Sequence, residues 1–153
     1  MEQELENLFL LIRQSMSDFA SRIVAAKPGA KSDVGHYSNS AFLLRSYAGF
    51  RVDAAGDEVG VTVDVKRHDD GGISIDSEIC MADGVIVMPG PAARLSANSP
   101  DPASNDAVTQ WQEKFKRFLD MSEPLVLAAI CQMATAPASQ PQHGDGTQKT
   151  SMF

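Results

Sequence analysis

The stretch VGVTVDVKRHDDGGISIDSEI, residues 59–79, decides the fold of this protein. In its first half, valine occupies every second position, and small, polar or charged residues stand between the valines. In its second half, isoleucines alternate with serine and acidic residues. A repeat of two is typical of β-strands that bury one face, because successive side chains of a strand point to opposite sides. The glycine pair between the halves allows a tight connection. The stretch therefore predicts a β-hairpin with one apolar and one polar face.

Further strands are predicted on both sides of this hairpin. Residues 41–47 form a short apolar run whose period does not separate strand from helix, although the turn-forming residues around it favour a strand. Residues 50–52 begin another strand, and residues 85–88 form a nearly continuous apolar one. Residues 28–40 indicate a polar loop, and residues 89–104, rich in Pro, Ala, Ser and Asn, an irregular connection. The sequence thus predicts an antiparallel meander of three to five strands.

Amphipathic helices are predicted before and after the meander. Residues 3–26 place apolar side chains at three- and four-residue steps on one face, and Lys27-Pro28-Gly29 ends that helix. After the meander, a helix capped by Ser104 or Asn105 carries an apolar stripe between residues 108 and 119.

A third helix is predicted near the end of the chain. Ser122-Glu123-Pro124 indicates a break, because proline is tolerated in the first turn of a helix but disrupts its interior. Residues 125–133 then form a short helix that is apolar on nearly all sides and should be buried or lie at an interface. We therefore predict an α+β fold: an N-terminal helix, an antiparallel β-meander of three to five strands, and two C-terminal helices packed on one sheet face. The two longer helices are expected to cover the valine and isoleucine face of the hairpin.

Length and composition suit one ordinary domain. The chain has 153 residues, and its apolar fraction of 43% is enough to build a core of that size. From residue 135 onward the sequence becomes rich in Pro, Ser, Gln and Gly, which cannot build a core. We predict a single α+β domain over residues 1–134 and a flexible C-terminal tail over residues 135–153.

Net charge, the lack of targeting signals and the cysteines limit the partners, the location and the cofactors that the sequence favours. The net charge of −7 argues against nucleic acid and against an anionic membrane surface, and it favours a basic protein partner. The acidic N-terminus lacks a signal-peptide pattern, and no apolar run approaches the roughly 20 residues that span a bilayer. Cys80 and Cys131 lack metal-binding spacing, so we expect free, buried thiols in a cytoplasmic protein without a cofactor.

His68-Asp69-Asp70 is the string most suggestive of chemistry. Imidazole and carboxylate groups together bind metals or move protons, and Asp64 and Glu78 on the flanking strands could project towards them. The string also ends in two glycines between alternating strands, which is typical of a solvated hairpin tip, and this interpretation is favoured. No catalytic or metal site is therefore predicted, and these five residues are only the candidates for the alternative.

The polar face of the hairpin is a candidate for partner binding. Asp64, Lys66, Asp76 and Glu78 are expected to share that face. Cross-strand ion pairs explain such a set, and a binding face for a partner is the alternative.

Apolar residues outside the expected core are further candidates. Leu10 and Leu11 make the stripe of the first helix wider than one packing face needs. This width favours either burial on two sides or packing against a second subunit, which would give a homo-oligomer. Met152 and Phe153 offer two more apolar contacts in the tail.

These observations favour a non-enzymatic, cytoplasmic protein-binding module that captures a partner through an acidic and apolar surface. Immunity proteins, adaptors and export chaperones share this size, charge and layout, which is an analogy without a motif behind it. One alternative is a small metal-dependent enzyme or ligand-binding protein that uses the His68-Asp69-Asp70 region. Another is a subunit of a larger bacterial assembly that is held by its tail.

Overall fold

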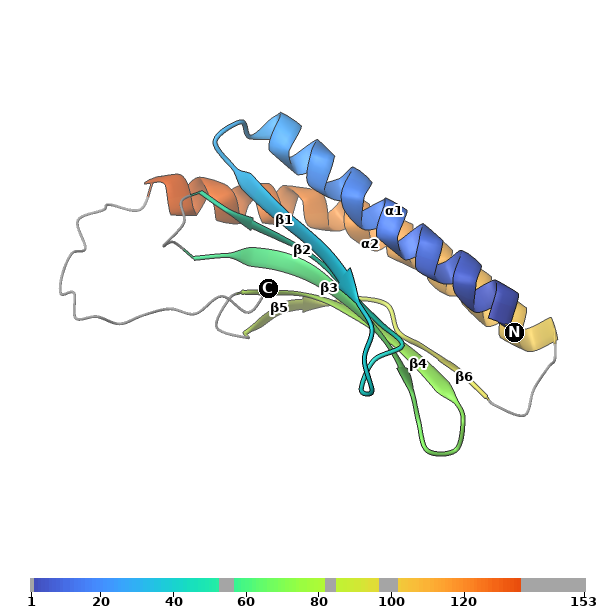
Figure 1. The fold of residues 1–153 in the computed structure, drawn as a ribbon. Helices are drawn as coiled ribbons and strands as arrows, with labels where there is room; N and C mark the ends of the chain where they lie inside the picture. The colour runs from blue at the N-terminus through green and yellow to red at the C-terminus, as the bar shows by residue number, and fades with distance from the viewer. Residues whose placement is uncertain (1, 53–56, 82–84, 97–101, 136–153) are drawn as a thin grey trace.

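Two helices lie on the same face of one antiparallel sheet and leave its other face open (Figure 1). The computed structural model describes residues 2–52, 57–81, 85–96 and 102–135, and all structural statements concern these residues. The elements are α1 (Glu2–Ala26), β1 (Lys31–Tyr37), β2 (Leu44–Arg51), β3 (Val59–Arg67), β4 (Ile73–Met81), β5 (Ile86–Pro89), β6 (Ala93–Leu95) and α2 (Pro102–Thr135).

The sheet is a meander in which each strand pairs with the next one along the chain. Its order is β1-β2-β3-β4-β5, and the short strand β6 also pairs with β4. β5 and β6 therefore share one edge of β4, and the edge is broken between them. Pro91 lies at the break, where its carbonyl oxygen accepts hydrogen bonds from Ser77 Oγ (2.7 Å) and Trp111 Nε1 (3.0 Å). These two bonds tie the broken edge to the sheet and to α2.

The apolar face of the β3–β4 hairpin is the floor of the core. The alternating valines of β3 and the isoleucines of β4 are all buried, as the repeat of two predicts. α1 packs over β1 and β2, and α2 packs over β3 and β6. Each buried side chain of this size contributes about 1.5–3 kcal/mol, so this layer is the main drive to fold. The helix residues that close the core are Leu5, Leu8, Ile12, Met16, Phe19, Ile23, Val108, Trp111, Phe115, Phe118 and Leu119. Both stripes are buried on the predicted face of the sheet, but the prediction that both helices cover the hairpin is wrong for α1, which lies over β1 and β2 instead.

The prediction of two C-terminal helices is wrong, because α2 is one helix with Pro124 inside it. The helix continues through the proline since its neighbours are held by packing: Ser122 and Val126 are buried, and Glu123 Oε1 lies 3.2 Å from Arg22 Nε of α1. Pro124 itself is exposed, so the hydrogen bond that its ring removes lies where water can serve the freed carbonyl. Tertiary packing therefore overrides the local break signal.

Two strands lie in segments that the sequence predicts as irregular. β1 falls within residues 28–40, and its composition is too polar for an alternating pattern because only Val34 packs against the core. The ring of Tyr47 lies against the backbone of Gly35, its cross-strand partner, where a side chain on β1 would collide with it. β6 is three residues long and falls within residues 89–104. Pairing with β2 and β4 therefore creates strands that the local sequence does not indicate.

The ambiguous run at residues 41–47 becomes the start of a strand. β2 runs from Leu44 to Arg51, so the two predicted strands, at residues 41–47 and from residue 50, are one. The residues before it form a turn, in which Asn39 Oδ1 accepts hydrogen bonds from the backbone N–H groups of Ala41 (2.8 Å) and Phe42 (2.9 Å).

Neither described helix carries a stretch long and apolar enough to cross a membrane.

Candidate protein-binding surface

The open face of the sheet carries a row of side chains that crosses four strands. Tyr37 of β1, Arg45 of β2, Asp64 of β3 and Asp76 of β4 are successive cross-strand partners. Since the neighbouring valines and isoleucines point to the helices, these four side chains point to the opposite face. The predicted polar face of the hairpin is thus part of a wider surface that includes β1 and β2.

Arg45 and Asp64 form the strongest ionic contact on this face. Arg45 Nε donates to Asp64 Oδ1 at 2.7 Å, and a second guanidinium nitrogen donates to Oδ2 at 2.8 Å. The hydrogen bonds to Asp64 raise the pKa of Arg45. Asp64 also stands directly opposite Asp76, and two like charges in that position repel each other. Arg45 therefore neutralises one carboxylate of the pair, and Asp64 is engaged in holding the sheet together.

The ring of Phe42 contacts two basic side chains at one end of the open face. The guanidinium carbon of Arg45 lies 4.2 Å from the centre of the Phe42 ring, and Lys66 Nζ lies 5.3 Å from it. The ring of Tyr37 meets the Phe42 ring edge-on at a centroid distance of 6.4 Å. Cation–π and edge-to-face contacts are attractive, so these side chains form one cluster. Sequence reasoning missed it because the cluster depends on the turn before β2.

Asp76 and Glu78 supply negative charge to the middle of the same face. Both project from β4 on the side away from the helices, and Asp76 is exposed whereas Glu78 is half-buried. In the part of the chain that the structure describes, neither carboxylate takes part in an ion pair, in contrast to Asp64. Of the three acidic residues proposed from the sequence, these two are the ones that remain available to a partner.

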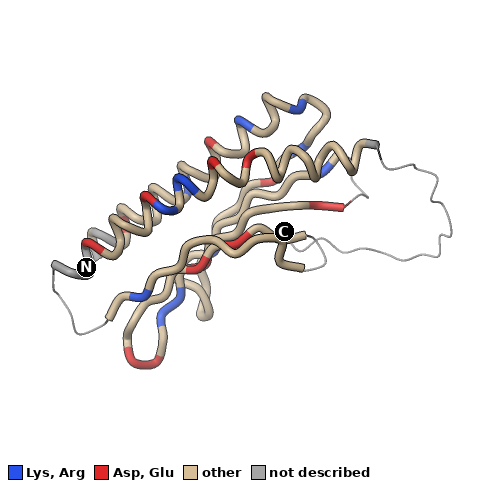
Figure 2. The backbone as a smooth tube through the Cα atoms, turned by 180° about the vertical axis from the view of Figure 1, so that it is seen from behind, with Lys and Arg blue, Asp and Glu red and all other residues tan. Residues whose placement is uncertain are grey.

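The tip of the β3–β4 hairpin is an ordinary tight turn. The backbone N–H of His68 donates to the carbonyl of Gly72 at 2.8 Å, and Gly71 adopts a φ of 83°. Asp70 accepts a hydrogen bond from the N–H of Gly72 (2.8 Å), which lowers the pKa of Asp70, and lies 3.5 Å from Arg94. The acidic tip stands out from the body of the sheet in Figure 2. The residues His68-Asp69-Asp70 therefore form part of the turn that connects β3 and β4.

His68 lies beside Ser74 and is not grouped with carboxylates that could complete a metal site. His68 Nε2 is 2.8 Å from Ser74 Oγ, and both residues line an open hollow of about 460 Å³ together with Asp76 and Arg94. Among the described residues, no three His, Cys, Asp or Glu side chains are placed to hold one metal ion. The five residues proposed from the sequence are therefore spread between the hairpin tip and the open face.

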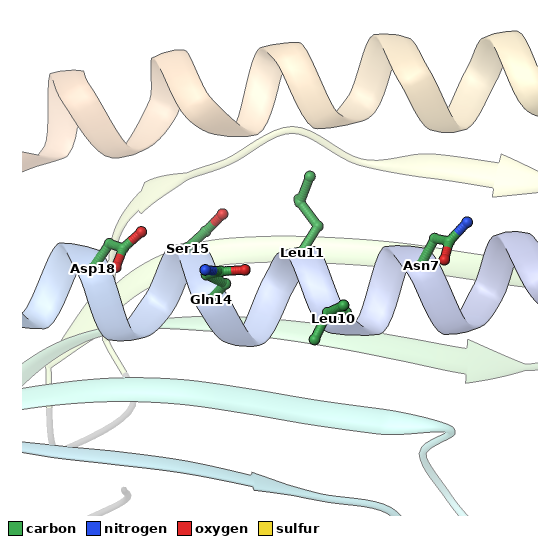
Figure 3. Close-up of a pocket in the computed structure, with 6 residues that line it drawn as sticks. All are labelled: Asn7, Leu10, Leu11, Gln14, Ser15 and Asp18. Carbon is green, nitrogen blue, oxygen red and sulfur yellow. The ribbon is translucent and has the colours of Figure 1, made fainter.

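Leu10 and Leu11 lie on the outer side of α1. Leu10 is 60% exposed, whereas Leu11 is half-buried. Figure 3 shows Leu11 directed towards α2 and Leu10 directed away from it. They border a shallow depression of about 320 Å³ whose other lining residues, all from α1, are Asn7, Gln14, Ser15 and Asp18. Of the two leucines that widen the apolar stripe, therefore, only Leu10 is exposed, and its neighbours are polar.

A larger exposed apolar surface lies at the β5 edge, where the sequence indicated only a strand. Ile86 and Val87 are 55% and 47% exposed, and Met121 and Leu125 of α2 are 62% and 42% exposed. Val87, Leu125, Ala129 and Met133 line a groove of about 320 Å³ between the strand and the helix.

Cys131 differs from the prediction that both thiols are buried. It lies on the exposed side of α2, whereas Cys80 is buried in β4, and the two form no disulfide. The helix faces the core through Val126 and Ile130, so its next residue turns towards solvent. Met152 and Phe153, the remaining partner-binding candidates, lie outside the described residues.

Comparison of the chain with protein-family models, with curated proteins and with solved structures gives no match in any of the three.

Proposed function

We propose that this protein is a non-enzymatic protein-binding module that captures a basic partner on the open face of its sheet. The observation that carries the proposal is the contrast between the two faces. One face is closed by α1 and α2, and the other leaves Asp76 and Glu78 outside any ion pair among the described residues. Two carboxylates without an ion pair can each accept a positive charge, so a basic partner suits this face.

The composition of the face supports this choice of partner. Tyr37 and Phe42 offer aromatic contact area at the β1–β2 end, and aromatic residues are enriched among those that dominate binding energy. The net charge of −7 attracts a basic protein over several ångströms and raises its association rate. The two cysteines form no disulfide, which suits a reducing compartment, and a cytoplasmic location is part of the proposal.

The test compares proteins captured from a lysate of the native host by three forms of the chain. The wild type is compared with a double variant, Asp76→Asn with Glu78→Gln, that keeps the shape of the face and removes two charges. The matched control is Glu6→Gln with Asp18→Asn, which removes two exposed charges from α1. A basic protein retained by wild type and control, and lost from the double variant, is the expected result.

The purified partner then gives a quantitative check. Its dissociation constant for the double variant should rise about tenfold or more, and the difference should shrink as salt is added. A partner that binds the double variant and the control equally well would contradict the proposal.

A hydrolytic enzyme is the second candidate, because of the contact between His68 and Ser74. A histidine nitrogen 2.8 Å from a serine hydroxyl in an open hollow has the spacing of a general base and its nucleophile. Labelling of Ser74 by a fluorophosphonate probe, lost in both His68→Ala and Ser74→Ala, would support it. Absence of labelling in the wild type would remove it. The metal-dependent form is tested by metal analysis of the purified protein.

Membership of a larger assembly remains a third proposal. It depends on the predicted tail at residues 135–153, most of which lies outside the described residues. Removal of residues 136–153 should release the protein from the assembly if the tail holds it there.

A further inference from the structure

The two edges of the sheet differ in how they are protected from other strands. An exposed edge can pair with a strand of another molecule, and proteins usually prevent this with charged residues or prolines. β1 carries Lys31 and Asp33 at its exposed edge. β5 lies at the opposite edge, and residues 85–88, Val-Ile-Val-Met, contain no charge (Figure 1). Charge therefore guards only the β1 edge, and at the β5 edge Pro89 guards the end of the strand and leaves the apolar run before it uncharged.

The uncharged run of β5 is continued on α2 by further apolar residues. Met121, Leu125 and Ala129 follow one another at four-residue steps and so lie along one side of the helix. Leu125 and Ala129 also line the groove that Val87 borders. A strand placed beside β5 would therefore meet apolar side chains of the helix as well as the strand. This extends the contact beyond four residues, towards the roughly 800 Å² per partner that a stable interface needs.

We propose that β5 pairs with β5 of a second copy of this chain, so that the two sheets join across a two-fold axis. Antiparallel pairing of identical strands is closed and self-complementary, because each residue meets a residue of the same strand. β5 carries no charged residue, so its pairing with a second copy brings no like charges together on a chain of net charge −7. Pro89 and Pro91 lack N–H donors and limit the pairing to residues 86–88 of β5.

This interface is centred on the edge of β5 and does not involve Asp76 or Glu78, so the two proposals can fail separately. Ile86 lies opposite Cys80, which belongs to the open face, whereas Val87 lines the groove on the helix side. Dimerisation would join the open faces of both copies into one longer sheet surface. The double variant of Asp76 and Glu78 should therefore dimerise as the wild type does.

The first test measures the mass of the full chain by sedimentation velocity over a range of concentrations. The wild type is expected to approach twice the mass of one chain as its concentration rises. Ile86→Lys and Val87→Lys should each raise the dimer dissociation constant about tenfold or more, because a charge would face its own copy. The matched control is Leu10→Lys, which places the same charge on the exposed leucine of α1. A monomer at every concentration, or a dimer dissolved by Leu10→Lys and not by Val87→Lys, would overturn the proposal.

The second test does not depend on whether a lysine variant folds well. Ile86→Cys in a Cys80→Ala, Cys131→Ser background places a single thiol close to the two-fold axis, because Cys80, the cross-strand partner of Ile86, could otherwise form a disulfide within one chain. Oxidation should give a disulfide-linked dimer on a non-reducing gel, whereas Leu10→Cys in the same background should stay monomeric. Equal cross-linking of both cysteine variants, or none of Ile86→Cys beside a wild-type dimer, would place the contact elsewhere and refute β5 pairing.

Discussion

At the scale of single residues, the break in the sheet edge depends on the absence of a side chain at Gly90. The N–H of Gly90 donates to the carbonyl of Ser77 at 2.9 Å, so the backbone lies close against β4 and α2. A methyl group at this position would overlap Ser77 Oγ and come within 2.9 Å of the Phe118 ring. Glycine is therefore required here for space, since its φ is not positive.

We expect Gly90→Ala to lower the free energy of unfolding by about 1–3 kcal/mol, because overpacking forces the neighbours apart. Urea denaturation followed by circular dichroism measures the change. Gly29→Ala is the control, because a methyl group there meets nothing within 4 Å. That variant should be neutral or stabilising by up to about 1 kcal/mol through the unfolded state. Equal effects of the two substitutions would contradict the crowding at Gly90.

His36 links stability to pH. Its Nδ1 lies 2.8 Å from the hydroxyl of the buried Ser46, and burial, followed by the positive charge of Arg13, lowers the pKa of His36 below 6.5. The unfolded chain therefore binds a proton at a higher pH than the folded protein does. The contribution to stability is complete above about pH 6.5 and is lost as pH falls through the lowered pKa of the folded state.

We expect His36→Gln to remove this part of the pH dependence. Urea denaturation of wild type and variant between about pH 8 and pH 5 measures it. Arg13→Gln should reduce the dependence without abolishing it, because it removes only the second cause of the shift. A wild type and a His36→Gln variant that lose stability in parallel over this range would contradict the role of His36.

At the scale of elements, α2 shows how packing outweighs a local signal. Ser122 Oγ donates to the carbonyl of Phe118, one turn earlier, and Arg22 of α1 contacts both Asp120 and Glu123 around the proline. The first apolar stripe ends at Leu119, and Val126 and Ile130 continue the buried side of the helix beyond Pro124. The break signal is strong locally, but ending the helix there would expose those two residues.

We expect Pro124→Ala to raise the free energy of unfolding by about 1–2 kcal/mol. Alanine restores the missing backbone hydrogen bond, and the greater freedom of the unfolded chain offsets part of the roughly 3 kcal/mol difference in helix propensity. Chemical denaturation measures the gain, and Glu113→Ala on the exposed side of α2 is the control, with an effect within about 0.5 kcal/mol. A less stable Pro124→Ala protein would mean that the helix is built around the proline ring.

At the scale of the whole molecule, one layer of helices and one layer of strands leave the two faces of the sheet with opposite roles. Neighbouring residues of β3 differ in environment: Val63 is fully buried beneath the helices, whereas Thr62 is half-buried and faces outward beside Glu78. Any surface for a partner must therefore lie on the open face, on the outer sides of the helices or at the sheet edges.

We expect Val63→Asp to prevent folding at ordinary temperature, because a buried unpaired charge costs at least several kcal/mol. Thr62→Asp introduces the same charge one residue away and should leave the protein folded, with a loss of about 1 kcal/mol or less. Circular dichroism and thermal denaturation distinguish the two. A Thr62→Asp protein that unfolds like Val63→Asp would contradict the open face.

The sequence by itself determined the hairpin, the two amphipathic stripes and the side of the sheet that they cover. These features repeat with a period of two or of 3.6 residues, so a local pattern carries them. Tertiary structure alone decided the features that depend on contacts between distant residues. Among these are β1, the single helix through Pro124, the gathering of Arg45 and Lys66 around Phe42, and the exposure of Ile86 and Val87. An apolar run such as residues 85–88 has the same sequence pattern whether the strand is buried or exposed. Only its neighbours in space determine which of the two it is.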